Sequence, residues 1–171
     1  MNWNITRRGR VTYYRKPTND VFSDLVVEEL DNGDLKIRFV GMTGAHAATK
    51  ELGLDDMADM EPLKEIPRLF DTWDMYVKEA GICGSLADLD FLELHSFGAA
   101  PKSPSPYVDP EGYHKERERI RFEYHKAYAD YWKSNMPDSG MPTRFTVYLS
   151  DLPDKWASYE MVAVALLQKD R

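Results

Sequence analysis

The stretch from Asp24 to Val40 reads DLVVEELDNGDLKIRFV and decides the fold class. Two apolar-rich segments, 24–30 and 35–40, flank the turn DNGD at 31–34, whose residues tolerate a positive φ. In the second segment apolar and basic residues alternate, as expected for a strand with one buried face. The pattern predicts a β-hairpin in the N-terminal part of the chain.

Further strand patterns stand at both ends of the chain, and helix patterns stand between them. Strands are expected at 10–16, where Pro17 closes the segment, and at 143–150 and 159–168. Pro67 can open a helix and Gly81 can stop it. The predicted helices are 45–52, 67–80, 86–94 and 111–135; the apolar density of 86–94 also permits a buried strand.

This order of elements predicts a single α+β domain over residues 1–171. The simplest arrangement is an antiparallel sheet of about four to five strands, built from the N- and C-terminal parts, with three to four helices packed on it. Residues 98–112 contain four prolines and predict a stiff, exposed loop, a length that favours a binding or lid role.

Composition restricts the class of protein. The chain has 171 residues, 43% of them hydrophobic, which is enough for a core. Its one cysteine, Cys83, excludes an intramolecular disulfide and a cysteine-rich zinc site, and suits a reducing compartment. No run of about 18 apolar residues predicts a membrane span. We therefore expect a cytoplasmic protein, in the host cytoplasm if it is viral, without a cofactor.

The charge is segregated along the chain. Residues 1–16 hold five basic residues and no acidic one, whereas residues 51–94 hold twelve acidic and three basic residues, a net charge of −9. A basic arm and an acidic body can pair internally, join copies of the chain or meet charged partners. The candidate partner-binding residues are Arg7, Arg8, Arg10, Asp55, Asp56, Asp59 and Glu61.

One candidate ligand site lies where the second hairpin strand leads into a helix. Gly41, Thr43 and Gly44 precede the helix expected at 45–52, and free amides at a helix start can hold a phosphate or carboxylate. Thr43 would cap the helix and His46 would face the ligand. The segment lacks the spacing of a P-loop or a dinucleotide fingerprint, and an ordinary structural turn explains the same residues.

A second candidate is the polar row of His114, Glu118, Arg121 and His125 on the long helix, at intervals of four, three and four. Such a row can do acid–base work or hold an anion. The two histidines are three turns apart, too far to share one metal ion, so no metal site is predicted. A solvated flank with an ion pair fits the row equally well.

A third pattern is the interleaving of aromatic and basic residues at the N-terminus. Trp3, Tyr13 and Tyr14 alternate with arginines, a composition that can contact phosphates and stack bases. An edge strand protected by basic residues has the same pattern. The net charge of −7 argues against a dedicated nucleic-acid binder.

Charge segregation and missing catalytic motifs favour a non-catalytic interaction protein: a small acidic inhibitor, an immunity-type protein or a viral accessory factor that meets a basic protein surface. One alternative is an assembly subunit, in a homo-oligomer or a viral particle. Another is a small hydrolase or transferase that binds a phosphorylated ligand through the 41–44 turn and the histidines.

Overall fold

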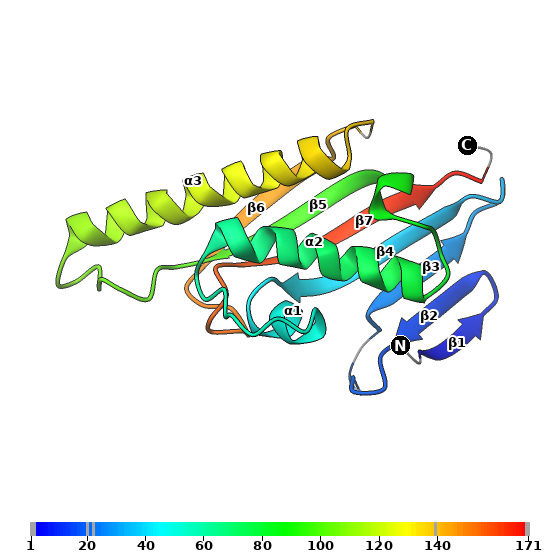
Figure 1. Cartoon of the computed structure of the whole chain (residues 1–171), viewed down its shortest axis with the longest axis horizontal. Coiled ribbons are helices and arrows are strands. Elements are labelled where there is room, and N and C mark those ends of the chain that lie inside the picture. Colours follow the sequence, from blue (N-terminus) through cyan, green and yellow to red (C-terminus); the bar gives the residue numbers. More distant parts are fainter. Residues whose placement is uncertain (1–2, 20, 22, 139, 170–171) are drawn as a thin grey trace.

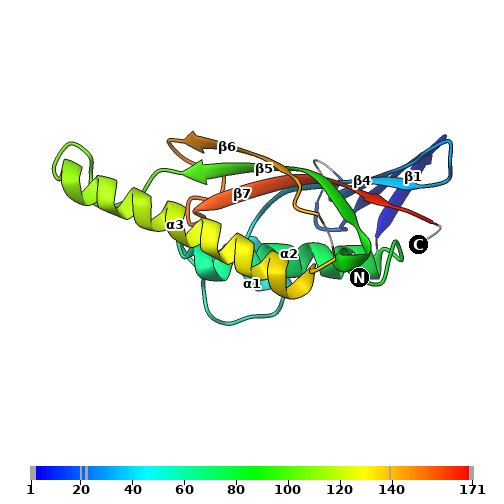
Figure 2. The same cartoon turned by 90° about the horizontal axis from the view of Figure 1, so that it is seen from above.

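The chain forms one mixed sheet of seven strands with its helices on one side (Figures 1 and 2). A computed structural model describes residues 3–19, 21, 23–138 and 140–169. The strands are β1 (Asn4–Arg8), β2 (Val11–Arg15), β3 (Leu25–Glu29), β4 (Leu35–Thr43), β5 (Asp90–Ala99), β6 (Thr143–Leu149) and β7 (Tyr159–Leu167). The helices are α1 (His46–Glu51), α2 (Pro62–Glu79), the short 3₁₀ helix η1 (Leu86–Asp88) and α3 (Pro110–Asn135).

The sheet order is β1-β2-β3-β4-β7-β5-β6. Every neighbouring pair is antiparallel except β5 and β6, which are parallel and are connected through α3. A parallel pair needs such a crossover, so the long helix itself makes the sheet mixed. The predicted α+β class and the hairpin of β3 and β4 are confirmed, but the sheet has seven strands instead of four to five and is not wholly antiparallel.

Two predicted elements differ from the structure, and one strand was not predicted. Residues 86–94 are mainly strand: a capping box between Ser85 and Asp88 starts only the single turn of η1, and β5 begins at Asp90. The helix expected from Pro67 begins at Pro62, with Pro67 inside it. The first strand, β1, was not predicted, because all five of its residues are exposed and show no alternation.

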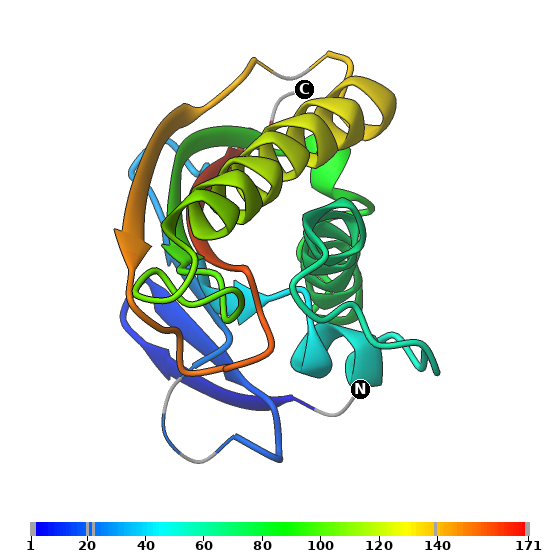
Figure 3. The ribbon, with the colours of Figure 1, turned by 90° about the vertical axis from the view of Figure 1, so that its left-hand side faces the viewer.

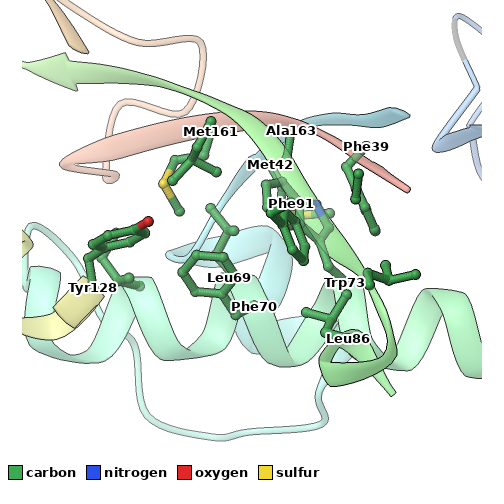
Figure 4. Packing of buried hydrophobic residues seen from close by; sticks show 14 of the residues in the cluster. Phe39, Met42, Leu69, Phe70, Trp73, Leu86, Phe91, Tyr128, Met161 and Ala163 are labelled. Atoms are coloured by element: carbon green, nitrogen blue, oxygen red, sulfur yellow. The ribbon is translucent and has the colours of Figure 1, made fainter. Parts of the chain in front are cut away.

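The core fills the space between the helical layer and the sheet (Figures 3 and 4). Trp73 of α2 is fully buried, with its ring centroid 4.9 Å from that of Phe39 on β4 and 5.6 Å from that of Phe70. On α3, Trp132 places its ring 5.4 Å from Phe91 of β5. Aromatic contacts of this kind fix both long helices against the strands.

The other face of the sheet is not covered by any described helix (Figure 2). Its outward positions include Val162 and Val164 on β7, Val147 and Phe145 on β6, and Phe145 is 59% exposed. A sheet face that meets water usually carries polar residues, so this apolar stretch is unusual. Within the described residues, no helix is both long and apolar enough to cross a membrane.

Candidate functional site

A pocket of about 630 Å³ lies where β4 ends and β7 begins, beside the loop that follows β2. Five segments line it: residues of the 16–24 loop, the end of β4 at 40–43, Glu51 of α1, the 153–154 turn and Glu160 of β7. Its volume is in the range of small-ligand sites. Four carboxylates and one ammonium group face this space.

The floor of the pocket is a buried polar network around Lys16. The Lys16 ammonium contacts the Glu51 carboxylate and the Tyr76 hydroxyl, and lies 3.4 Å from Asp24 Oδ1. Asp24 also accepts a hydrogen bond of 2.7 Å from the Lys16 backbone amide. Burial, followed by the charge of Glu51, raises the pKa of Tyr76, so its hydroxyl stays protonated and donates to Glu51. These groups satisfy one another.

A second pair closes the side of the pocket. Thr43 Oγ1 donates a hydrogen bond of 2.9 Å to Asp154 Oδ2, which ties the end of β4 to the turn before β7. The other oxygen of Asp154 accepts from the Trp156 amide at 3.1 Å. Asp154 is therefore held in place by its own neighbours.

Glu160 differs from the other three carboxylates of the pocket. Its side chain forms no ion pair or hydrogen bond with any described residue, and burial alone raises its pKa. A Cβ on Gly41 would lie 2.2 Å from Glu160 Oε1, so the glycine leaves the space that the carboxylate occupies. The register of β4 against β7 shifts between Phe39 and Met42, which places Gly41 at an irregularity.

This arrangement has a definite chemical capacity. A half-buried carboxylate without a partner favours a ligand that brings a hydrogen-bond donor or a positive charge. Because its pKa is raised, Glu160 can also take up or release a proton closer to neutral pH than an ordinary glutamate. The pocket therefore suits a small ligand with an amine or a similar donor.

The residues at 41–46 that were predicted to form one ligand site do not all lie in the pocket. Gly41 and Thr43 line the pocket, but Thr43 does not cap α1, whose N-cap is Ala45 without a side-chain hydrogen bond. Gly44 is buried against the Glu65 backbone. The side chain of His46 lies outside the described residues. The prediction of Thr43 as a helix cap is wrong, because its hydroxyl is engaged by Asp154.

The polar row of α3 does not form one site. Glu118 and Arg121 pair with each other at 2.6 Å. His125 Nδ1 lies 3.0 Å from Arg144, and burial together with nearby arginines lowers its pKa. His114 is eleven residues, or about 16 Å of helix, from His125. None of the described histidine side chains lines the β4–β7 pocket.

Most of the candidate partner-binding charges are paired inside the chain. Asp56 binds Arg68 at 2.7 Å, and Glu61 binds Lys64 at 3.0 Å. The remaining pairs, Arg7 with Glu29 and Arg10 with Asp31, join the basic arm to β3 and the turn after it. Asp55 and Arg8 are exposed. Cys83 donates to the Ser85 carbonyl, and burial raises its pKa to about 11.

Sequence reasoning missed Glu160, Lys16, Glu51 and Asp24 as parts of one site. These residues come from four separate segments, so no local spacing connects them. One signal was present: Glu160 is the only charged residue in the apolar run from Tyr159 to Leu167. A charge within a strand of this kind is costly unless a partner or ligand uses it.

Comparison with known proteins gives a relationship at the level of structure. No protein-family model matches the sequence, and no curated protein matches it. Several solved structures share the fold. The likeness is one of fold alone. Protein PA3499 of Pseudomonas aeruginosa, of unknown function, is 16% identical over 98% of this chain and 95% of its own, with a TM-score of 0.56.

Two further proteins with this fold come from enteric bacteria. TdcF of E. coli, solved with bound serine, is 14% identical over 88% of this chain and 91% of its own, with a TM-score of 0.55. YyfA of Yersinia pestis, from the conserved Rid protein family, is 18% identical over 86% of this chain and 89% of its own, with a TM-score of 0.53.

These comparisons correct the functional expectation from the sequence. The prediction of a non-catalytic inhibitor, immunity-type or viral accessory factor is wrong, because the solved structures that share the fold, among them TdcF and YyfA, are proteins of cellular organisms. The prediction of a location in a host cytoplasm depended on the chain being viral, so it has no support either. Charge segregation misled the prediction because most of those charges are paired within the chain.

Proposed function

We propose that the chain binds a small amine-bearing metabolite in the β4–β7 pocket and that Glu160 receives the amine. The observation that carries this proposal is the half-buried Glu160 carboxylate, which no described side chain neutralises. An ammonium group beside it would replace the missing partner with a charge-assisted hydrogen bond. The serine bound to TdcF, which shares the fold, makes an amino acid a reasonable first ligand to test.

The rest of the pocket supports a ligand of this class. Lys16, Glu51 and Asp24 form a polar floor of paired charges, which can position the remaining polar groups of the ligand. Val40, Met42 and Pro153 provide apolar walls. Glu160 would act as acceptor and, with its raised pKa, as general acid or base toward the amine.

The test is a titration of serine and other small amino acids into the purified chain, followed by calorimetry at pH 7. Glu160→Gln keeps the shape and removes the charge, so we expect at least tenfold weaker binding, since charge-assisted hydrogen bonds contribute about 1.5–3 kcal/mol. Glu111→Gln is the matched control, because Glu111 is exposed at the start of α3. Equal affinity in wild type and Glu160→Gln would contradict the proposal.

We also propose that the uncovered sheet face binds further copies of the chain. Val147, Val162, Val164 and the exposed ring of Phe145 present apolar area on a face that lacks a second layer. Apolar patches on a protein surface commonly mark interfaces, and a second sheet packed at about 10 Å would remove these side chains from water.

A further inference from the structure

The open face of the β1–β2 hairpin carries a second hollow, of about 340 Å³, that shares no lining residue with the β4–β7 pocket. Asn4, Thr6, Arg8, Tyr13, Arg15 and Ser23 line it. The register pairs Thr6 with Tyr13 and Asn4 with Arg15, so these side chains project from the same face of the two strands.

The structure divides the basic and aromatic residues of the N-terminus into two groups. Tyr14 and Trp3 face the helical layer, where the Trp3 ring packs edge-on against Tyr14 and Tyr76. Lys16 belongs to the floor of the other pocket. Tyr13, Arg8 and Arg15 remain on the open face.

The arginines of the hairpin are not equivalent. Arg7 pairs with Glu29, and Arg10 pairs with Asp31. Arg8 and Arg15, which line the hollow, form no ion pair with any described residue. The acidic residue on the neighbouring strand at this face, Glu28, pairs with Arg38 at 3.8 Å. Two guanidinium groups therefore face the hollow without a neutralising acid.

Their placement fits a particular ligand chemistry. Arg8 lies opposite Val11, and Arg15 lies four residues beyond Val11 on β2, so the two arginines are about 13 Å apart along the strands, with Tyr13 between them. A tyrosine ring on a sheet can stack a planar base, and a guanidinium group binds phosphate in a bidentate manner. Asn4, Thr6 and Ser23 add hydrogen-bonding groups for a sugar.

We propose that the open face of the β1–β2 hairpin binds a nucleoside phosphate, with the base on Tyr13 and the phosphate on Arg8 or Arg15. Glu28, Glu29 and Asp31 border this small basic area, and the chain has a net charge of −7. These charges disfavour a long nucleic-acid track and favour one nucleotide, either free or at the end of an oligonucleotide.

The test is calorimetric titration with AMP, adenosine, inorganic phosphate and a single-stranded RNA hexamer at low salt. Wild type should bind AMP at least tenfold more tightly than adenosine or phosphate, because base and phosphate are bound together. Arg8→Ala/Arg15→Ala should weaken AMP binding at least tenfold, and Tyr13→Ala about fivefold or more. Tighter binding of the hexamer than of AMP, lost in the same variants, would support the site and assign the nucleotide to an RNA.

The matched control is Arg7→Ala/Arg10→Ala, which removes the same charge from the same hairpin outside the hollow. This variant should bind AMP within about twofold of wild type. Equal losses of AMP affinity in the two double variants would overturn the proposal, because they would mean that the positive charge of the hairpin attracts AMP without a specific site. Absence of AMP binding to wild type at millimolar concentration would also overturn it. Neither result bears on the proposed amine site in the β4–β7 pocket, which shares no lining residue with the hollow. Glu160→Gln should accordingly leave AMP binding unchanged.

Discussion

At the scale of single residues, Glu65 is the clearest electrostatic feature outside the pocket. Its carboxylate is fully buried and accepts hydrogen bonds of 2.8 Å from both the Ser158 amide and the Ser158 hydroxyl. Burial raises its pKa to about 8, although these donors act in the opposite direction. Glu65 thus joins α2 to Ser158, which directly precedes β7 and lies two residues before Glu160.

The raised pKa predicts how stability depends on pH. A group whose pKa is higher in the folded state adds stability below its unfolded pKa and loses that contribution as pH rises through its folded pKa. As the pH rises from 4.5 to about 8, the ionisation of Glu65 should therefore lower the free energy of unfolding by up to about 1.4 kcal/mol per pH unit. Glu65→Gln should remove this slope in urea unfolding, whereas Glu111→Gln should keep it. Identical slopes in wild type and Glu65→Gln would refute the assignment.

Gly44 allows the closest backbone approach beside the pocket. A Cβ at this position would lie 1.7 Å from the Glu65 carbonyl oxygen, a clash that a side-chain movement cannot relieve. Gly44→Ala should therefore cost about 1–3 kcal/mol of unfolding free energy, the range for overpacking. Gly140→Ala is the control, because nothing lies within 4 Å of its added Cβ. A urea midpoint of Gly44→Ala equal to that of wild type would show that the backbone at Gly44 or Glu65 can move to accommodate the added methyl group.

At the scale of elements, α3 depends on one tryptophan near its C-terminal end. Trp132 is 3% exposed and contacts the rings of Phe70 and Phe91, at 6.1 and 5.4 Å, so it joins α3 to both α2 and the sheet. We expect Trp132→Ala to cost about 3–5 kcal/mol in chemical unfolding. Phe122→Ala, on the same helix but with 69% exposure, should change stability by less than about 0.5 kcal/mol. Similar losses of unfolding free energy in both variants would mean that helix propensity, and not the packing of Trp132, determines the contribution of α3 to stability.

The elements also show how far the sequence determines the fold. The strands predicted at 35–40 and 159–168 correspond to β4 and β7, because their patterns are local. Residues 86–94 are apolar enough for either a helix or a strand, and pairing of β5 with β7 decides between them. The pairing of β5 with β6 depends on the path of α3, which no local pattern contains.

The candidate site was predictable only in part. Gly41 and Thr43 were found from a strand-to-helix pattern, but their role differs from the predicted one: Gly41 leaves space for Glu160, and Thr43 binds Asp154. Lys16 was assigned to a basic arm because its charge was visible and its burial was not. Side chains that meet through tertiary structure alone are beyond any argument from sequence spacing.

At the scale of the whole molecule, the one-sided layering of Figures 2 and 3 raises the question of what covers the sheet. The β1–β2 end of the open face is polar and basic, whereas the β7–β5–β6 end exposes Val162, Val164, Val147 and Phe145, with His95 and Glu160 beside them. A lone chain would leave the apolar end in water. A second copy packed there would bury it.

Phe145 offers a selective test of this assembly, because it is 59% exposed and lies on the edge strand β6, where a substitution costs the single chain little. We expect wild type to sediment as an oligomer and Phe145→Asp to shift toward monomer, since a buried charge without a partner disfavours the interface by several kcal/mol. Phe122→Asp, which alters an equally prominent ring on the helical side, should sediment like wild type. A wild-type chain that stays monomeric at all concentrations would leave the apolar face without this role.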